Sequence, residues 1–385
     1  MTRKRVPLGD FVQEYSVRNK KDEDIPVYSV TSSQGFCREY FGKEVASKDK
    51  TTYKIVPYGY FAYNPSRINA GSVDWQRCED RVIVSPLYNV FSVPDELDRQ
   101  FLYYFLKSNL GRQIIQAKAA GSVRDNLKLE MLKEMTIPDI SLEEQQECVA
   151  ALDKLQQLIQ LRQDELIELD TLIKARFVEM FGDPVANPMG WPMVALEDCL
   201  HGIENGKSFV CSNEARTGLS PAVLKLSAAT YGEYRPNENK AILDTSMFVD
   251  SAEVHSGDLL FTRKNTPKLV GMCAYVTYTP QKLMMPDLIF RLNTEPVCNK
   301  IFLWKLINHD LFRDCIGAIA TGSAKSMSNI SKERLGKLRI ILPPIVEQEQ
   351  FAAFAAQADK SKVVVQKALD EAQALFDSLM QQYFG

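Results

Sequence analysis

Two segments of the chain carry apolar residues at alternating spacings of three and four positions. The first stripe has arginines at positions 162 and 176 and otherwise comprises Val149, Leu152, Leu155, Ile159, Leu166, Leu169, Ile173 and Met180. The second has Lys362 in one position and otherwise comprises Ala352, Ala355, Ala358, Val365, Leu369, Ala372, Phe376, Leu379 and Tyr383. This period is typical of a coiled-coil seam. Because neither stretch contains glycine or proline, the pattern predicts two helices of about 39 residues, each roughly 58 Å long.

The two helical segments belong to a longer internal repeat. Glu144-Gln145 stands 38 residues before Gly182, and Glu347-Gln348 stands the same distance before Gly385, so the segments align without a gap. Upstream markers also recur: Ile137-Pro138-Asp139-Ile140 with Leu342-Pro343-Pro344-Ile345, Gly121-Ser122 with Gly322-Ser323, and Asn126-Leu127 with Asn329-Ile330. The repeat predicts two domains, residues 1–140 and 191–343, each followed by a long helix, residues 141–182 and 344–385.

The order of these parts predicts how the helices run. Each domain leads into the start of its own helix, and the second domain follows the first helix after the turn at residues 183–190. A second helix that packs on the first must therefore run antiparallel to it. We expect an α+β protein in which two mixed α/β domains are joined by an antiparallel coiled coil with a pseudo-two-fold internal repeat. The alternative is that each helix packs against a separate partner.

Charge becomes informative only when it is divided along the chain. The net charge is −3, yet residues 1–140 hold 21 Lys and Arg against 18 Asp and Glu, and residues 191–343 hold 18 against 15. The predicted helical segments are acidic. The two domains are thus mildly basic, as a nucleic-acid partner would favour, although excesses of this size also arise without function.

Several classes of protein receive no support from the sequence. The eight cysteines form no C-x-x-C pair and the three histidines stand apart, so we expect no metal site. There is no P-loop, no glycine-rich cofactor turn and no nuclease-like carboxylate cluster. No apolar run reaches the roughly 18 residues of a membrane span, and the N-terminal residues do not resemble a signal peptide, so we expect a soluble cytoplasmic protein.

Short motifs in a fixed order resemble a known family. Phe181-Gly182-Asp183-Pro184, then Asn187-Pro188-Met189-Gly190-Trp191, and the Pro343–Gln348 entry into the second helix lie within the two-domain plan. Together they resemble the specificity subunit of type I restriction-modification systems, and the resemblance covers essentially the whole chain.

The resemblance implies a DNA-binding role without catalysis. In that family two target recognition domains each read one half of a split DNA site, while the paired helices set the gap and dock two methyltransferase subunits. S-adenosylmethionine, ATP and magnesium are expected on partner subunits, namely the methyltransferases and the restriction motor subunits, and this chain is expected to hold no cofactor. Two alternatives stay open: a stand-alone methyltransferase or endonuclease with built-in recognition domains, and a coiled-coil scaffold with no role in DNA binding.

Candidate DNA-contacting residues lie where loops leave predicted strands and offer hydroxyls, amides and cations. In the first domain they are Ser32, Ser33, Asn64, Ser66, Arg67, Asn69, Ser122 and Arg124. In the second they are Thr230, Arg263, Lys264, Lys268, Ser323 and Lys325. Asn64-Pro65-Ser66-Arg67 begins like the Asn-Pro-Pro-aromatic loop of adenine methyltransferases but lacks the second proline and the ring, so we expect no catalytic residue there.

Overall fold

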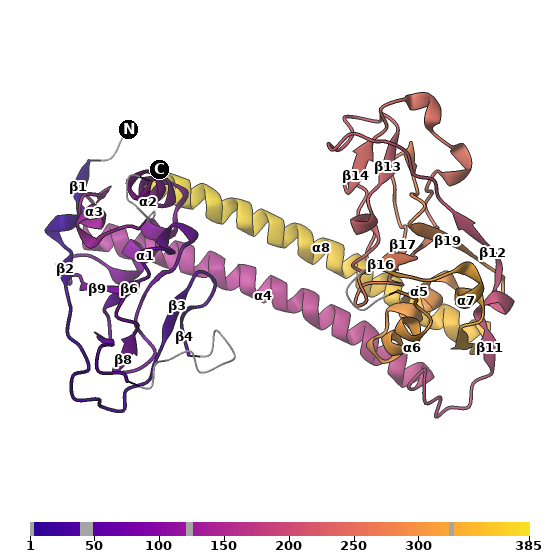
Figure 1. Cartoon of the computed structure of the whole chain (residues 1–385), viewed down its shortest axis with the longest axis horizontal. Coiled ribbons are helices and arrows are strands. Elements are labelled where there is room, and N and C mark those ends of the chain that lie inside the picture. Colours follow the sequence, from indigo (N-terminus) through magenta and orange to yellow (C-terminus); the bar gives the residue numbers. More distant parts are fainter. Residues whose placement is uncertain (1–3, 39–48, 121–125, 323–326) are drawn as a thin grey trace. The chain divides into compact units, whose positions relative to one another are not determined.

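The computed structural model describes residues 4–38, 49–120, 126–322 and 327–385. The chain divides into two compact units: unit 1 comprises residues 1–164 and 366–385, and unit 2 comprises residues 165–365. Both long helices are present, α4 (Leu142–Phe181) and α8 (Ile345–Phe384), and each contributes one part to each unit (Figure 1). The predicted α+β class with two long helices is confirmed. Among the described residues, no helix has both the length and the apolar composition needed to cross a membrane.

Unit 1 is built around a four-stranded antiparallel sheet. Its order is β2 (Gln13–Glu14), β9 (Asn89–Ser92), β6 (Phe61–Tyr63) and β7 (Val73–Trp75). Three antiparallel pairs accompany it: β1 (Arg5–Pro7) with β10 (Thr136–Pro138), β3 (Ser29–Thr31) with β4 (Gly35–Cys37), and β5 (Lys54–Pro57) with β8 (Arg81–Val84). Helices α1 (Arg99–Lys107), α2 (Asn109–Ala119) and α3 (Leu129–Lys133) complete it.

Unit 2 repeats this plan and enlarges it. Its four-stranded sheet has the order β12 (Leu200–Asn205), β19 (Ile289–Thr294), β15 (Leu259–Thr262) and β17 (Cys273–Tyr275), and β11 (Met193–Ala195) pairs with β21 (Arg339–Ile341). Helices α5 (Lys300–Asn308), α6 (Arg313–Ala318) and α7 (Lys332–Gly336) follow the order of α1 to α3. Unit 2 also contains a sheet of β14 (Asn239–Ala241), β13 (Ala222–Leu224) and β18 (Leu283–Met284), and the pair of β16 (Lys264–Asn265) with β20 (Ser328–Asn329).

The long helices pair in an antiparallel manner inside each unit. In unit 1, Cys148 and Leu152 of α4 share a buried core with Met380 and Phe384 from the end of α8. In unit 2, the rings of Phe177 and Phe181 at the end of α4 lie 5.4 and 5.5 Å from that of Phe351 near the start of α8. Residues at the end of one helix thus meet those at the start of the other, as the order of domains predicts.

The polar interruptions of the predicted seam have structural explanations in unit 2. The Lys362 ammonium forms an ion pair with Asp170 of the facing helix and lies 3.1 Å from Asp359 on its own helix. The Arg176 guanidinium binds Glu179 at 2.8 Å and lies over the ring of Phe354. The long aliphatic stems of these residues therefore occupy seam positions while their charged groups find partners.

A buried glutamine explains why Glu-Gln recurs at the start of both long helices. The Gln145 Oε1 accepts from the backbone N–H of Asp98 at 2.8 Å, and the Gln348 Oε1 accepts from that of Asn299 at 2.9 Å. Asp98 and Asn299 cap α1 and α5 through their side chains. Each glutamine Nε2 also donates to two backbone carbonyls, those of Glu96 and Ile140 in unit 1 and of Val297 and Pro343 in unit 2. The repeated motif thus anchors each long helix to its own domain.

We expect Gln348→Met to lower the free energy of unfolding of unit 2 by about 1 to 3 kcal/mol, because it leaves buried backbone groups without partners in a site that is fully buried. Peptide-resolved hydrogen exchange of the full chain measures the loss. Gln350→Met, at an exposed position of the same helix turn, is the matched control and should change little. Equal protection in the two variants would contradict the anchoring role.

Candidate nucleic-acid interface

The turn that carries Ser32 and Ser33 joins β3 to β4, and both serines are exposed. Thr31 pairs with Gly35 across the turn, and the Gln34 N–H donates to the Thr31 hydroxyl at 3.0 Å. Gly35 has a φ of +62°, and a Cβ built on it would lie 1.9 Å from an Asp74 carboxylate oxygen. The turn can approach β7 this closely only because residue 35 is glycine.

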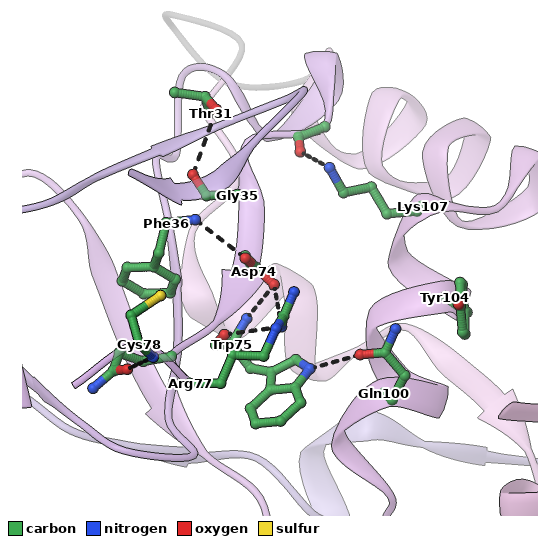
Figure 2. Close-up of polar contacts among 12 residues, drawn as sticks. Thr31, Gly35, Phe36, Asp74, Trp75, Arg77, Cys78, Gln100, Tyr104 and Lys107 are labelled. Atoms are coloured by element: carbon green, nitrogen blue, oxygen red, sulfur yellow. Dashed lines mark hydrogen bonds and ion pairs between the residues drawn. The ribbon is translucent and has the colours of Figure 1, made fainter. Parts of the chain in front are cut away.

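Asp74 is a buried carboxylate that holds this turn against the sheet (Figure 2). It accepts from the backbone N–H of Phe36 at 3.1 Å and of Trp75 at 2.8 Å, and from the Arg77 guanidinium at 3.0 Å. The same guanidinium lies 4.8 Å from the centre of the Trp75 ring. Burial raises the pKa of Asp74, against the opposing effects of Arg77 and the two N–H groups. These bonds hold β4 against β7 and therefore fix the position of the Ser32-Ser33 turn relative to the central sheet.

The loop between β6 and β7 carries the other predicted residues of unit 1. The half-buried Asn64 accepts through its side-chain oxygen from the Ser66 N–H at 3.1 Å and the Ser66 hydroxyl at 2.9 Å. The Asn69 side-chain oxygen accepts from the Ala70 N–H at 2.9 Å. Ser66 and Arg67 are exposed. The two asparagines therefore shape the loop, and the Ser66 hydroxyl is bonded to one of them, whereas the Arg67 guanidinium has no side-chain bond to a residue that the structure describes.

One lysine brings the turn and the loop together. The Lys107 ammonium, at the end of α1, donates to the Ser32 carbonyl at 3.0 Å and to the Gly71 carbonyl at 2.6 Å. It also lies 5.4 Å from the centre of the Tyr103 ring. A cavity of about 330 Å³ beside it is lined by the Ser32-Ser33 turn, Lys107, the exposed Arg112 and parts of α4 and α8 from the same unit. Two segments predicted separately thus form one surface.

The three predicted cations of unit 2 differ in their exposure and in their bonds. The Arg263 guanidinium is half-buried, donates to the Asn329 side-chain oxygen at 3.1 and 3.3 Å, and lies 5.0 Å from the centre of the Phe290 ring. Lys264 is half-buried and Lys268 is exposed, and neither forms an ion pair with a residue that the structure describes. The three cations therefore differ in role: Arg263 is committed to packing, and the two lysines are available.

Thr230 lies inside unit 2, with 4% of its surface exposed. Its hydroxyl donates to the Leu226 carbonyl at 2.7 Å and accepts from the Asn265 amide at 3.1 Å. The residue next to it, Tyr231, is 54% exposed, and Arg235 lies over its ring at 5.0 Å. Thr230 thus ties the 228–232 segment to the loop after β15, and the outward-facing side chain of this segment is Tyr231.

Four predicted residues, Ser122, Arg124, Ser323 and Lys325, lie outside the described residues. No sequence pattern used above indicated Lys107, Arg112, Tyr231 or the buried Asp74. A usable signal was present for Arg112, because Arg313 stands at the same place in the repeat, five residues after the last residue of the corresponding helix. Within the described part of the chain, no three His, Cys, Asp or Glu residues are grouped as a metal site requires.

Residues 9–171 match the family model of the type I restriction modification DNA specificity domain. This match covers less than half of the chain and lies within its first half. The chain is 31% identical over 203 residues to the EcoEI specificity subunit of Escherichia coli, covering 51% of the present chain and 34% of that protein. It is 22% identical over 299 residues to the EcoKI specificity subunit of Escherichia coli K12, covering 73% and 63%. The matches thus span between about one third and two thirds of these relatives' own lengths.

A solved structure shares the fold of this chain. The S subunit of a type I restriction-modification system from Mycoplasma genitalium superimposes with a TM-score of 0.59 at 13% identity, covering 100% of the present chain and 96% of that chain. At this identity the likeness concerns the fold alone. It extends over both units, whereas the family model matches the first half of the sequence.

Proposed function

We propose that this chain is the DNA-binding specificity subunit of a type I restriction-modification complex and performs no catalysis itself. Its recognition domains, residues 1–140 and 191–343, each read one half of a bipartite site in double-stranded DNA. The paired helices, residues 141–182 and 344–385, set the gap between the half-sites and dock two methyltransferase subunits, which restriction subunits join. S-adenosylmethionine, ATP and magnesium belong to those partners.

The observation that carries this proposal is the repeated surface. In each unit, a strand pair of the central sheet ends in a loop that lies beside a second, sequence-distant segment: residues 64–72 with residues 32–34 in unit 1, and residues 263–272 with residues 230–232 in unit 2. One scaffold thus presents two loop pairs of different composition, Ser32, Ser33, Ser66 and Arg67 in one and Tyr231, Lys264 and Lys268 in the other. A split DNA site with two different halves requires such a pair of readers.

The decisive experiment compares genome methylation in the source strain with and without this gene. We expect one bipartite motif to lose methylation when the gene is deleted. In parallel, the purified chain should neither methylate nor cleave DNA, and should bind its site tightly only with methyltransferase subunits. Binding of S-adenosylmethionine by the isolated chain would support a stand-alone methyltransferase instead, and an unchanged methylome would contradict the proposal.

Charge neutralisation in unit 2 tests where DNA phosphates are contacted. We expect Lys264→Gln with Lys268→Gln to weaken DNA binding by the assembled complex roughly thirtyfold near 0.15 M salt, since each lost phosphate contact removes about 0.9 from the slope of log affinity against log salt. Fluorescence anisotropy titrations at several salt concentrations measure both quantities.

The control is Lys282→Gln with Lys337→Gln, which removes the same charge from lysines already neutralised by ion pairs. Lys282 lies 3.4 Å from Asp250, and Lys337 lies 2.6 Å from Glu333. Equal loss of affinity in both double variants would mean that net charge, rather than contact by Lys264 and Lys268, determines binding.

A further inference from the structure

The last turn of the helix that follows the central sheet bonds to the turn and the loop of the surface in unit 1. In unit 2 it bonds to the 230–232 segment and to Cys273, the first residue of β17 after the 263–272 loop. In unit 1 the contact is made by Lys107, the final residue of α1, whose ammonium joins the Ser32 carbonyl to the Gly71 carbonyl. These carbonyls belong to segments 39 residues apart in sequence, and no strand pairing of β3 or β4 with β6 or β7 connects them. Lys107 is therefore a direct polar link between the turn and the loop.

Unit 2 makes the equivalent link with neutral side chains. The final residue of α5, Asn308, donates through Nδ2 to the Cys273 carbonyl at 2.8 Å and accepts through Oδ1 from the Cys273 N–H at 2.9 Å. One turn earlier, the Trp304 indole N–H donates to the Gly232 carbonyl at 2.9 Å. Asn308 and Trp304 thus hold the end of the 263–272 loop and the 230–232 segment, as Lys107 holds the corresponding segments of unit 1.

An arginine five residues after the end of α1 and of α5 lies near the same part of the loop in each unit. Arg313 in unit 2 donates to the Gly271 carbonyl at 3.1 Å and to the Val270 carbonyl at 2.6 Å. Its counterpart Arg112 approaches the same place in unit 1, since one of its guanidinium nitrogens lies 3.8 Å from where a Cβ on Gly71 would stand. Gly71 and Gly271 both have positive φ, +89° and +74°. The two units therefore conserve the position of the link although its chemistry differs.

We infer that Lys107 in unit 1, and Trp304 with Asn308 in unit 2, are positioning residues that determine half-site specificity without touching DNA. This inference rests on the proposed function. Base discrimination requires that donors on two loops meet base edges at the same time, and hydrogen bonds tolerate only a few tenths of an ångström of misplacement. Asp74 holds the base of the turn to β7, and Lys107 bonds directly to both the turn and the loop. Without the Lys107 link, the turn and the loop can move relative to each other, so their donors no longer meet the base edges as one rigid set.

The Lys107 ammonium is committed to this link by its surroundings. Two of its three N–H donors are used by the carbonyls, and the side chain is half-buried between α1, the turn and the loop. Burial lowers the pKa of Lys107. The Asp74 carboxylate opposes this effect, and the Arg112 guanidinium adds to it. Arg112, which is exposed, is the cation of this cluster that stands available to a phosphate.

The test uses the complex with methyltransferase subunits and a DNA library randomised at both half-sites. We expect Lys107→Met to reduce base discrimination roughly tenfold at one half-site, the loss of about one good base contact, and to leave the other half-site and the salt dependence of binding unchanged. Asn308→Leu should do the same at the opposite half-site. Lys54→Met is the matched control, because Lys54 is also half-buried and donates to a carbonyl, that of Tyr88 at 2.6 Å, but joins neither loop.

Four results separate the possibilities. A salt slope that falls by about 0.9 in Lys107→Met, with discrimination intact, would show that Lys107 contacts a phosphate and would overturn the inference. Lys107→Gln, which keeps an N–H donor without charge, should retain more discrimination than Lys107→Met, and equal discrimination in the two would also count against it. Discrimination kept at the opposite half-site reports that the variant is folded. If the unaltered complex shows no preference at either half-site, the proposed function itself fails.

Discussion

Phe177→Ala should lower the free energy of unfolding of unit 2 by about 3 to 5 kcal/mol, the largest loss that we expect from a single substitution. Phe177 is fully buried, and its ring lies 5.0 Å from Phe181, 5.8 Å from Phe302 and 5.4 Å from Phe351. It joins the end of α4 to α5 and to the start of α8, so its removal leaves a cavity that three helices line. Denaturant unfolding of the full chain, with hydrogen exchange resolved by peptide, measures the loss and assigns it to unit 2.

Val178→Ala is the control for Phe177→Ala. Val178 is the next residue of the same helix and is 38% exposed, so its truncation removes few contacts. We expect its effect to stay within about 0.5 kcal/mol, as for surface positions in general. If Phe177→Ala were equally mild, the aromatic core between α4, α5 and α8 would not be what holds the helix pair to unit 2.

Gly35→Ala should destabilise the β3–β4 turn of unit 1 by about 2 to 4 kcal/mol. A positive φ disfavours any residue with a Cβ by about 1 to 2 kcal/mol, and the new methyl group would overlap an Asp74 oxygen that now accepts from the Phe36 N–H. Relief of the overlap must break that bond and displace Ser32 and Ser33. We therefore expect faster hydrogen exchange in residues 29–37 and weaker base discrimination at one half-site, measured with the same randomised library.

Gly218→Ala provides the comparison for the backbone effect alone. Gly218 has a φ of +59°, close to that of Gly35, but a Cβ there would meet no atom within 4 Å. The difference between the two variants therefore isolates the contact with Asp74. Similar losses of stability in the two variants would mean that the Asp74 side chain moves aside without displacing the turn.

The seam of the coiled coil was predictable almost residue by residue. Leu152, Ile173, Ala355 and Val365 are buried at the predicted positions, because a period of three and four residues identifies one face of any helix. Phe177, Phe351 and Phe384 were missed although they are fully buried. Phe177 and Phe351 contact each other across the helix pair, and Phe177 also contacts Phe302 of α5. Phe384 contacts Phe101 and Phe105 of α1. These residues therefore lie partly toward their own unit's domain, and a heptad pattern records only the face that meets the other helix.

The candidate site was predictable only in part. Exposed Ser32, Ser33, Ser66, Arg67 and Lys268 fit the roles that loop composition indicated, and those roles remain proposals. Arg263 and Thr230 carry suitable groups, but these groups are bound to Asn329 in one case and to Leu226 and Asn265 in the other. Residue type reveals what a side chain can donate or accept, whereas the fold decides whether another part of the protein already uses it.

The internal repeat, the two long helices and the antiparallel order in which they must pair follow from the amino-acid sequence, because periodicity and the order of segments are properties of the chain. Which loops share a surface, and what holds them there, is visible only in the folded structure. Lys107 meets Ser32 and Gly71, and Asp74 meets Phe36, across sequence separations that no local pattern records. Such contacts depend on how strands and helices pack, and packing is set by the shapes of many buried side chains acting together.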